Sequence, residues 1–200
     1  MTNNKLTAII LAGGKSSRMG QDKAMLPVDG IPLLLRVYQV AAACADTVYV
    51  ITPWQERYQD FLPPNCLFIC EELLTGETKG ELQTHGPIIG FAQGLAQVQT
   101  EWVLLLACDL PKLRVEILQA WIEKLDSVRE DAKAYLVQHS KGWEPLCGFY
   151  PKSCLPSLNE FINQGGRSFQ EWLQQNIVEV YPSPDPAMFF NCNTPSDLKE

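Results

Sequence analysis

Histidine clusters, cysteine pairs with metal-ligand spacing and runs of basic residues are all missing from this sequence. Its seven cysteines include no Cys-x-x-Cys pair, and His85 and His139 are its only histidines, so a zinc site has little support. Lysine and arginine number 16 against 23 acidic residues, for a net charge of -7. We therefore expect no nucleic-acid binding, which usually needs a basic face. We also expect both histidines at the surface rather than in a catalytic role.

Long apolar runs are missing as well. No apolar stretch approaches the roughly 18 residues that a membrane span needs, and the polar segment Met1 to Lys5 lacks the pattern of a signal peptide. The odd number of cysteines is typical of buried free thiols in a reducing compartment. We expect a cytoplasmic protein without membrane attachment.

The composition present is that of one globular domain. The chain has 200 residues, 46% of them hydrophobic and 20% charged, which suits a single α/β core without disulfides. We see no repeat, low-complexity tract or linker that would divide it. We therefore expect one domain over residues 1–200.

Hydrophobic periodicity alternates between strand and helix through the first two thirds of the chain. We expect strands over 7–11, 47–51, 67–70, 102–108, 134–137, 146–150, 177–181 and 188–190. We expect helices over 32–45, 87–98, 115–125, 153–163 and 168–175, and a further helix after Thr194. Such alternation predicts an α/β fold with a mainly parallel sheet and helices on both faces.

The strongest chemical pattern follows the first strand. Residues 11–20 are Leu-Ala-Gly-Gly-Lys-Ser-Ser-Arg-Met-Gly, and Asp22-Lys23 comes just beyond. Glycines let backbone N–H groups approach anionic oxygens closely, and Arg18 and Lys23 add positive charge. The spacing is neither that of a Walker A loop nor that of a Rossmann dinucleotide fingerprint. The loop is predicted to hold phosphates.

Asp109 directly follows the apolar strand expected over 102–108. Magnesium prefers one or two carboxylates together with phosphate oxygens and water, which makes this residue a candidate ligand. A turn or capping role before Pro111 is the alternative. Ligands in open α/β sheets bind at the carboxyl ends of strands, so Asp109 and the glycine loop can converge.

Four weaker segments have both a functional and a structural interpretation. Gly86 to Gly90 opens a helix and could frame a base or ribose. Asn191 and Asn193 alternate on a short extended segment, so both would face one side. Glu144 to Leu146 and Gly165 to Ser168 are loops that could meet an acceptor or simply turn the chain.

Taken together, these motifs resemble those of molybdenum cofactor guanylyltransferases. The specific match is Leu-Ala-Gly-Gly-x-Ser-x-Arg-Met-Gly-x-Asp-Lys, followed by Gly-Pro-Ile-Ile-Gly at 86–90, Cys-Asp-Leu-Pro at 108–111 and Asn-Cys-Asn-Thr-Pro at 191–195. The resemblance implies a three-layer, Rossmann-like fold of the nucleotide-diphospho-sugar transferase kind. It also implies Mg²⁺, with GTP and molybdenum-bearing molybdopterin as substrates, and the guanine dinucleotide cofactor and pyrophosphate as products.

The resemblance also assigns residues. The GTP-binding set that it implies is Leu11, Ala12, Gly13, Gly14, Lys23, Glu72 and Asp109. Glu72 stands where the family often has an Asp, and an Asn that some members carry after the second strand has no clear match at 51–53. Lys23, Arg18 and Asp109 would be catalytic, with magnesium on Asp109. The N-terminal half would bind GTP and the C-terminal half molybdopterin, where Asn191, Asn193 and Arg167 are candidates for acceptor binding.

The expected reaction needs no general base. A phosphate oxygen of the pterin, already an anion, would attack the α-phosphorus of GTP in line, so catalysis would consist of positioning and charge neutralisation. Proteins that deliver molybdopterin or mature molybdoenzymes are expected as transient partners. Three alternatives stay open: a CTP-dependent molybdopterin enzyme, a sugar-phosphate nucleotidyltransferase and a nucleotide-binding regulatory module.

Overall fold

The computed structural model describes residues 6–13, 22–72, 86–140, 142–182 and 185–192. Its main sheet consists of β1 (Thr7–Leu11), β4 (Thr47–Ile51), β5 (Leu67–Ile69), β6 (Trp102–Ala107), β7 (Ala134–His139), β8 (Gly142–Pro151) and β9 (Val178–Val180). The α-helices are α1 (Leu33–Cys44), α2 (Pro87–Gln97), α3 (Val115–Ile122), α4 (Leu155–Asn163) and α5 (Phe169–Gln174). Short 3₁₀ helices are η1 (Lys23–Met25), η2 (Gln55–Arg57), η4 (Leu125–Ser127), η5 (Lys152–Cys154) and η6 (Pro186–Phe189).

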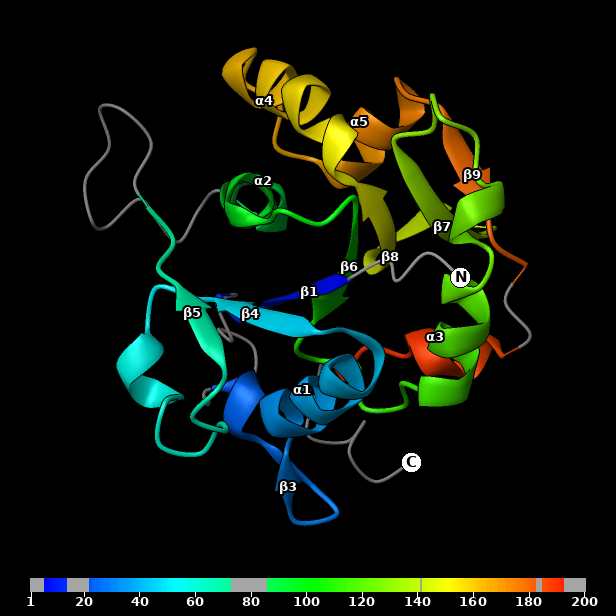
Figure 1. The fold of residues 1–200 in the computed structure, drawn as a ribbon. Helices are drawn as coiled ribbons and strands as arrows, with labels where there is room; N and C mark the ends of the chain where they lie inside the picture. Colours follow the sequence, from blue (N-terminus) through cyan, green and yellow to red (C-terminus); the bar gives the residue numbers. More distant parts are fainter. Residues whose placement is uncertain (1–5, 14–21, 73–85, 141, 183–184, 193–200) are drawn as a thin grey trace.

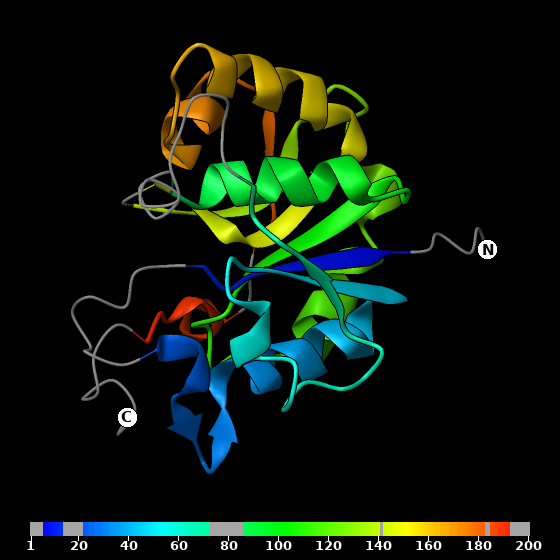
Figure 2. The ribbon, with the colours of Figure 1, turned by 90° about the vertical axis from the view of Figure 1, so that its left-hand side faces the viewer.

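The strand order in the sheet is β5-β4-β1-β6-β8-β7-β9. The first four strands are parallel, β8 is antiparallel to both β6 and β7, and β9 runs parallel to β7. Helices cover both faces, with α1 and α3 on one side and α2, α4 and α5 on the other (Figures 1 and 2). The expected three-layer α/β fold is confirmed.

Two apolar layers enclose the sheet. One packs α1, α3 and η6 against alternate residues of β1 and β6, and the other packs α2, α4 and α5 against the remaining residues. All six residues of β6 are buried, as expected of a central strand covered on both faces. The site therefore sits on a rigid platform, the carboxyl ends of β1 and β6, which are joined by a bond from the Cys108 N–H to the Leu11 carbonyl at 3.2 Å.

Two local predictions are wrong, and one element was not predicted. A strand over 188–190 is replaced by η6, because Pro186 occupies its first turn and the Asp185 side chain accepts from the Ala187 N–H. The loop expected over 144–146 belongs to β8, which pairs with β7 from Gly142 onward. An unpredicted hairpin, β2 (Pro27–Val28) and β3 (Ile31–Pro32), turns on Asp29-Gly30 with φ of 51° and 79°, as a tight primed turn requires.

All seven cysteines are free thiols, and four of them are buried. Among the described residues, no helix combines the length and the apolar character that crossing a membrane would demand.

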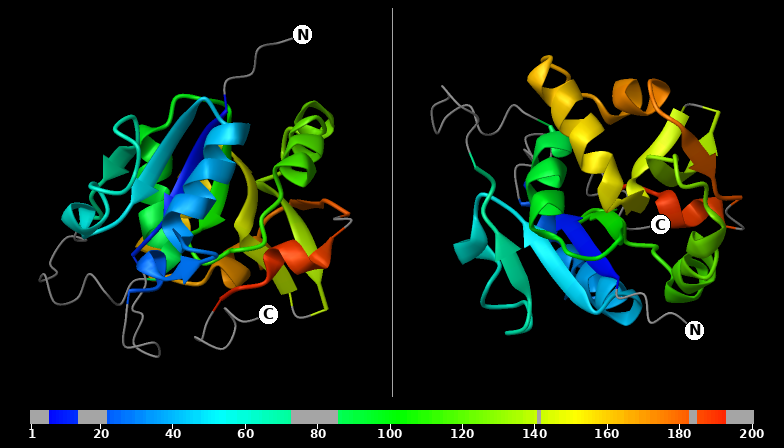
Figure 3. Two further views of the ribbon diagram at one scale, coloured as in Figure 1. Left: turned by 90° about the horizontal axis from the view of Figure 1, so that it is seen from below. Right: turned by 45° about the horizontal axis from the view of Figure 1, so that its top comes forward.

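Figure 3 shows η6, in red, beside the β7–β8 end of the sheet. Its Phe189 ring lies 5.6 Å from the ring of His139.

Candidate active site

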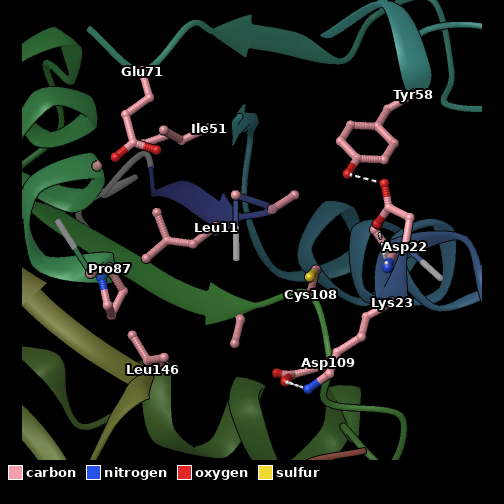
Figure 4. A pocket seen from close by; sticks show the side chains of 16 residues that line it. Leu11, Asp22, Lys23, Ile51, Tyr58, Glu71, Pro87, Cys108, Asp109 and Leu146 are labelled. Atoms are coloured by element: carbon pink, nitrogen blue, oxygen red, sulfur yellow. Dashed lines mark hydrogen bonds and ion pairs between the residues drawn. The ribbon is translucent and has the colours of Figure 1, made fainter. Parts of the chain in front are cut away.

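A cavity of about 310 Å³ opens at the carboxyl ends of β1 and β6 (Figure 4). It is lined by Leu11, Ala12, Gly13, Asp22, Lys23, Ala24, Ile51, Tyr58, Glu71, Gly86, Pro87, Gly90, Ala107, Cys108, Asp109 and Leu146. Five residues that the sequence singled out for nucleotide binding therefore share one cavity, namely Leu11, Ala12, Gly13, Lys23 and Asp109. This is the position that ligands take in open α/β sheets.

One end of the cavity carries the charge pair. The Lys23 ammonium lies 3.5 Å from the Asp109 carboxylate, and each side chain is 20% exposed. Burial raises the pKa of Asp109, and Lys23 opposes that rise. A phosphate group could replace Asp109 as the partner of Lys23, and a cation could replace Lys23 as the partner of Asp109. The pair therefore indicates a binding site for charged ligands.

Lys23 is held by a short capped turn. It opens η1, whose N-cap Asp22 accepts from the Ala24 N–H at 3.1 Å. The other oxygen of Asp22 accepts a 2.7 Å bond from the hydroxyl of buried Tyr58 and lies 3.7 Å from Arg57. Burial and the bond to Asp22 raise the pKa of Tyr58 far above its usual range. The phosphate-side turn is thus fastened to the segment after β4.

The opposite end of the cavity carries a different carboxylate, that of Glu71 (Figure 4). Burial raises its pKa from the ordinary 4.5 to about 7. A Cβ on Gly13 would lie 3.1 Å from a Glu71 oxygen, and one on Gly90 would lie 3.7 Å from the other oxygen. Gly13, just after β1, and Gly90, on α2, therefore leave room for this carboxylate against the backbone.

Glu72, the residue predicted to meet guanine, is exposed and is not among the residues lining the cavity. Its backbone N–H donates to the Gln93 side-chain oxygen at 2.9 Å, and its carbonyl accepts from the Gln93 amide at 2.8 Å. These two hydrogen bonds tie the backbone of Glu72 to α2, next to Glu71, whose side chain lines the cavity. The assignment of Glu72 to GTP binding remains a prediction.

Gly86 to Gly90 forms the start of α2, as expected. Gly86 has φ of +73° and is followed by Pro87 at the first helical position. Glycine adopts a positive φ without strain, and proline is favoured at the first position of a helix. Gly86, Pro87 and Gly90 all line the cavity. The segment therefore frames the Glu71 end of the site.

The predicted acceptor residues have mixed placements. Asn191 is not on a strand, and its amide donates to the Phe189 carbonyl at 3.4 Å. The N–H of the next residue, Cys192, donates to the Asp109 carbonyl at 3.0 Å. The Arg167 guanidinium donates to the carbonyls of Ile162 and Gly166 at the end of α4. Gly14, Arg18, Asn193 and His85 lie outside the described residues.

Asp109 is the described carboxylate best placed to hold a cation. Asp22 also lines the cavity, but both of its oxygens are already engaged by Ala24, Tyr58 and Arg57. Across the described part of the chain, no group of three or more His, Cys, Asp and Glu side chains forms a metal-ligand set. The donor set fits a hard cation that draws most of its ligands from phosphates and water, as Mg²⁺ does.

Three residues of the site were missed by the sequence interpretation. Asp22 belongs to the opening motif, and its place directly before Lys23 is one where an Asp can cap a helical turn, which could have indicated its role. Glu71 is the direct neighbour of Glu72, the residue that was predicted to bind GTP. Tyr58 carried no usable pattern, because its contact with Asp22 spans 36 residues of sequence.

Comparison with known proteins identifies the family of this chain. The model of the MobA-like NTP transferase domain matches residues 8–179. A relative from a Nostoc species, described as a probable molybdenum cofactor guanylyltransferase, is 62% identical over 195 residues, which cover 98% of this chain and 89% of the relative. One of the same description from Synechococcus elongatus is 42% identical over 190 residues, covering 95% of this chain and 94% of the relative.

A solved structure shares the fold. Molybdopterin-guanine dinucleotide biosynthesis protein A from Archaeoglobus fulgidus superposes with a TM-score of 0.76 at 22% identity, covering 96% of this chain and 95% of that one. The family match and the two sequence relatives carry the classification, and this likeness supports the fold. The chain belongs to the MobA-like NTP transferase family and, within it, to the molybdenum cofactor guanylyltransferases.

Proposed function

We propose that this protein transfers GMP from GTP to molybdenum-bearing molybdopterin, forming the guanine dinucleotide cofactor and releasing pyrophosphate. The observation that carries the proposal is a single cavity with the Lys23–Asp109 pair at one end and the Glu71 carboxylate at the other. That arrangement suits a nucleotide whose phosphates lie at the first end and whose base lies at the second. The relatives described as molybdenum cofactor guanylyltransferases support the choice of substrates.

Guanine fits the Glu71 end better than the other bases. Its N1–H and 2-amino groups form adjacent donors, and an ionised carboxylate offers two adjacent acceptors. Adenine and cytosine present no such donor pair. The backbone of Leu11, Ala12 and Gly13 forms the floor beneath the base, with Glu71 in the role that the sequence suggested for Glu72. A site built to bond a donor pair rejects bases that lack it, since its own polar group is then left unpaired.

Magnesium belongs at the other end. Asp109 would hold it together with phosphate oxygens and water. When bound, the ion would neutralise charge on the transferring group. Gly14 and Arg18 keep the phosphate-binding roles that the motif predicts for them.

The chain's own residues then have separable tasks. Lys23 balances the negative charge that moves onto the leaving pyrophosphate, and the capped turn of η1 keeps its ammonium near that charge. Asp109 stands at the end of the buried strand β6, so its carboxylate is held in place. The attacking oxygen of the acceptor phosphate is already anionic, and no residue has to remove a proton from it. Asn191, Asn193 and Arg167 remain candidates for the acceptor side in the C-terminal half.

We further propose that the reaction takes place in the cytoplasm, with transient contacts to proteins that supply molybdopterin and receive the product. The CTP-dependent, sugar-phosphate and regulatory alternatives are separated by one assay. Purified protein is incubated with Mg²⁺, GTP, CTP or ATP, and either molybdenum-loaded molybdopterin or a sugar phosphate, and pyrophosphate is measured. We expect pyrophosphate release only in the mixture that contains both GTP and molybdenum-loaded molybdopterin. Release with CTP or a sugar phosphate instead, or none in any mixture, would contradict the proposal.

A further inference from the structure

A further partly buried carboxylate, that of Glu144, lies at the same edge of the sheet. Glu144 lies on β8, and its oxygen is 3.5 Å from Nε2 of His139 on β7, with the two side chains 26% and 31% exposed. Burial raises the pKa of Glu144, and His139 opposes the rise. His139 is thus half-buried rather than a fully exposed surface residue. The sequence interpretation placed Glu144 in a loop that could meet an acceptor or simply turn the chain.

The backbone on both sides of Glu144 is fixed by side chains. On one side, the Gln170 side chain bonds both the N–H and the carbonyl of Trp143, at 3.1 and 2.7 Å. On the other, the hydroxyl of buried Tyr150 donates to the Pro145 carbonyl at 2.7 Å. At Gly142, where φ is +129°, a Cβ would lie 2.7 Å from the Gln170 oxygen, so the glycine permits this clamp. Glu144 therefore projects from a preorganised strand.

The fold connects this carboxylate with the reacting end of the nucleotide cavity. β8 runs antiparallel to β6, and Leu106 pairs with Cys147. The residues that precede Cys147 on β8 therefore extend past the carboxyl end of β6, where Asp109 lies. Leu146, two residues from Glu144, lines the nucleotide cavity. On its other side, the His139 ring packs against the Phe189 ring of η6. Three residues after Phe189, the N–H of Cys192 donates to the Asp109 carbonyl.

We propose that Glu144, held by His139, reads the 2-amino-4-oxo edge of the pterin acceptor, an inference that rests on the proposed function. A pterin presents an N3–H and a 2-amino group side by side, which is the same donor pair that guanine presents. A carboxylate accepts both hydrogens, whereas a glutamine amide can accept only one and would set a donor against the other. Glu71 and Glu144 would then select the two halves of the dinucleotide by the same chemistry, on opposite sides of the phosphates.

The proposal is tested with pterin and lumazine, which differ in that lumazine has a carbonyl in place of the 2-amino group. Neither carries the acceptor phosphate, so no turnover occurs. Binding is followed by ligand fluorescence with the nucleotide cavity saturated by GTP. We expect the wild-type protein to bind pterin at least tenfold more tightly than lumazine, which corresponds to about 1.4 kcal/mol, and Glu144→Gln to lose that preference. Glu160→Gln, which alters an exposed carboxylate on α4 that does not line the nucleotide cavity, is the matched control and should retain it.

Each outcome bears on the assignment. Equal affinity of the wild-type protein for the two compounds, displacement of pterin by GTP, or no binding of either at millimolar concentration would overturn it. So would a Glu144→Gln variant that only melts at a lower temperature and keeps the preference, since that is the behaviour of a hairpin ion pair. If Glu144→Gln does not fold, the wild-type comparison still decides, and His139→Gln provides a second variant with a reduced preference.

Turnover separates this inference from the proposed function. With GTP and molybdopterin, Glu144→Gln should raise the KM for the pterin at least about tenfold and leave the KM for GTP unchanged. If the wild-type protein releases no pyrophosphate but still prefers pterin through Glu144, the proposed function fails and the pterin site stands. If it turns over and Glu144→Gln leaves the pterin KM unchanged, the function stands and the site falls.

Discussion

The hydroxyl of Tyr58 donates a 2.7 Å hydrogen bond to Asp22, the residue that caps the turn on which Lys23 stands. Tyr58 is 1% exposed, so this bond is sheltered from water and costly to leave unmade. It joins the segment after β4 to the far end of the glycine loop. Tyr58 is therefore a positioning residue for Lys23, although it belongs to none of the motifs of the sequence.

Tyr58→Phe should lower kcat by about tenfold, because a lost hydrogen bond to a charged group amounts to about 1.5 kcal/mol or more. The KM for GTP should change less, since contacts with the base remain. Tyr38→Phe is the matched control, because it removes a hydroxyl that donates to Asn65 at 3.4 Å, away from the cavity. Equal losses of activity in the two variants would mean that Tyr58 serves stability alone.

Lys23→Ala and Asp109→Asn should each lower kcat by about a hundredfold or more, the scale seen when one preorganised charge is removed from a transition state. GTP affinity should fall much less, and Asp109→Asn should also need more magnesium for half-maximal activity. Steady-state turnover and direct GTP binding are measured on the same preparations. Asp29→Asn, which alters an exposed carboxylate paired with Arg36, controls for the change in net charge. Near-wild-type turnover in either variant would remove that residue from the mechanism.

The pKa of Glu71 predicts a pH dependence of both stability and binding. Its folded-state pKa of about 7 lies above the ordinary 4.5, so the folded state holds more protons between these values. Its contribution to the free energy of unfolding is therefore fully present below about 4.5 and is lost as the pH rises through about 7. Glu71→Gln should lack this loss in thermal melts recorded across that range.

GTP binding should show the opposite trend, because the proposed contact with guanine needs the ionised carboxylate. Affinity should increase as the pH rises through about 7 in the wild-type protein. In Glu71→Gln this step should be absent, while titration of the GTP phosphates is common to both proteins and cancels in the comparison. Identical pH profiles for the two proteins would contradict the assignment of Glu71 to guanine.

Gly13→Val should abolish GTP binding while the protein stays folded. A Cβ here would already lie 3.1 Å from the Glu71 carboxylate and 3.3 Å from Pro53, and the two further methyl groups of valine would need still more room. Calorimetry with GTP measures the loss, and circular dichroism checks the fold. Gly90→Ala is the milder comparison, because its Cβ would make contacts of 3.5 Å or longer. Tight GTP binding by Gly13→Val would exclude this part of the backbone from the site.

Local patterns in the sequence were enough to predict the platform of the site. The buried strands β1 and β6 follow from short apolar runs, and Leu11 and Asp109 mark their carboxyl ends because each run stops there. Parallel strands place those ends at one edge, so the approach of Lys23 to Asp109 was foreseeable. The start of α2 at Gly86-Pro87 was equally local, since both residues restrict the backbone directly.

Tertiary packing decided what periodicity could not. Glu71 and Glu72 are chemically equivalent neighbours, yet only Glu71 lines the cavity, while the backbone of Glu72 is bonded to the side chain of Gln93 on α2. Glu144 became a strand residue because β8 pairs with β7 on both sides of it, and its surroundings depend on Gln170 and Tyr150. These contacts join residues far apart in the chain or choose between adjacent ones. Their energies depend on distances and burial that exist only once the helices have packed onto the sheet.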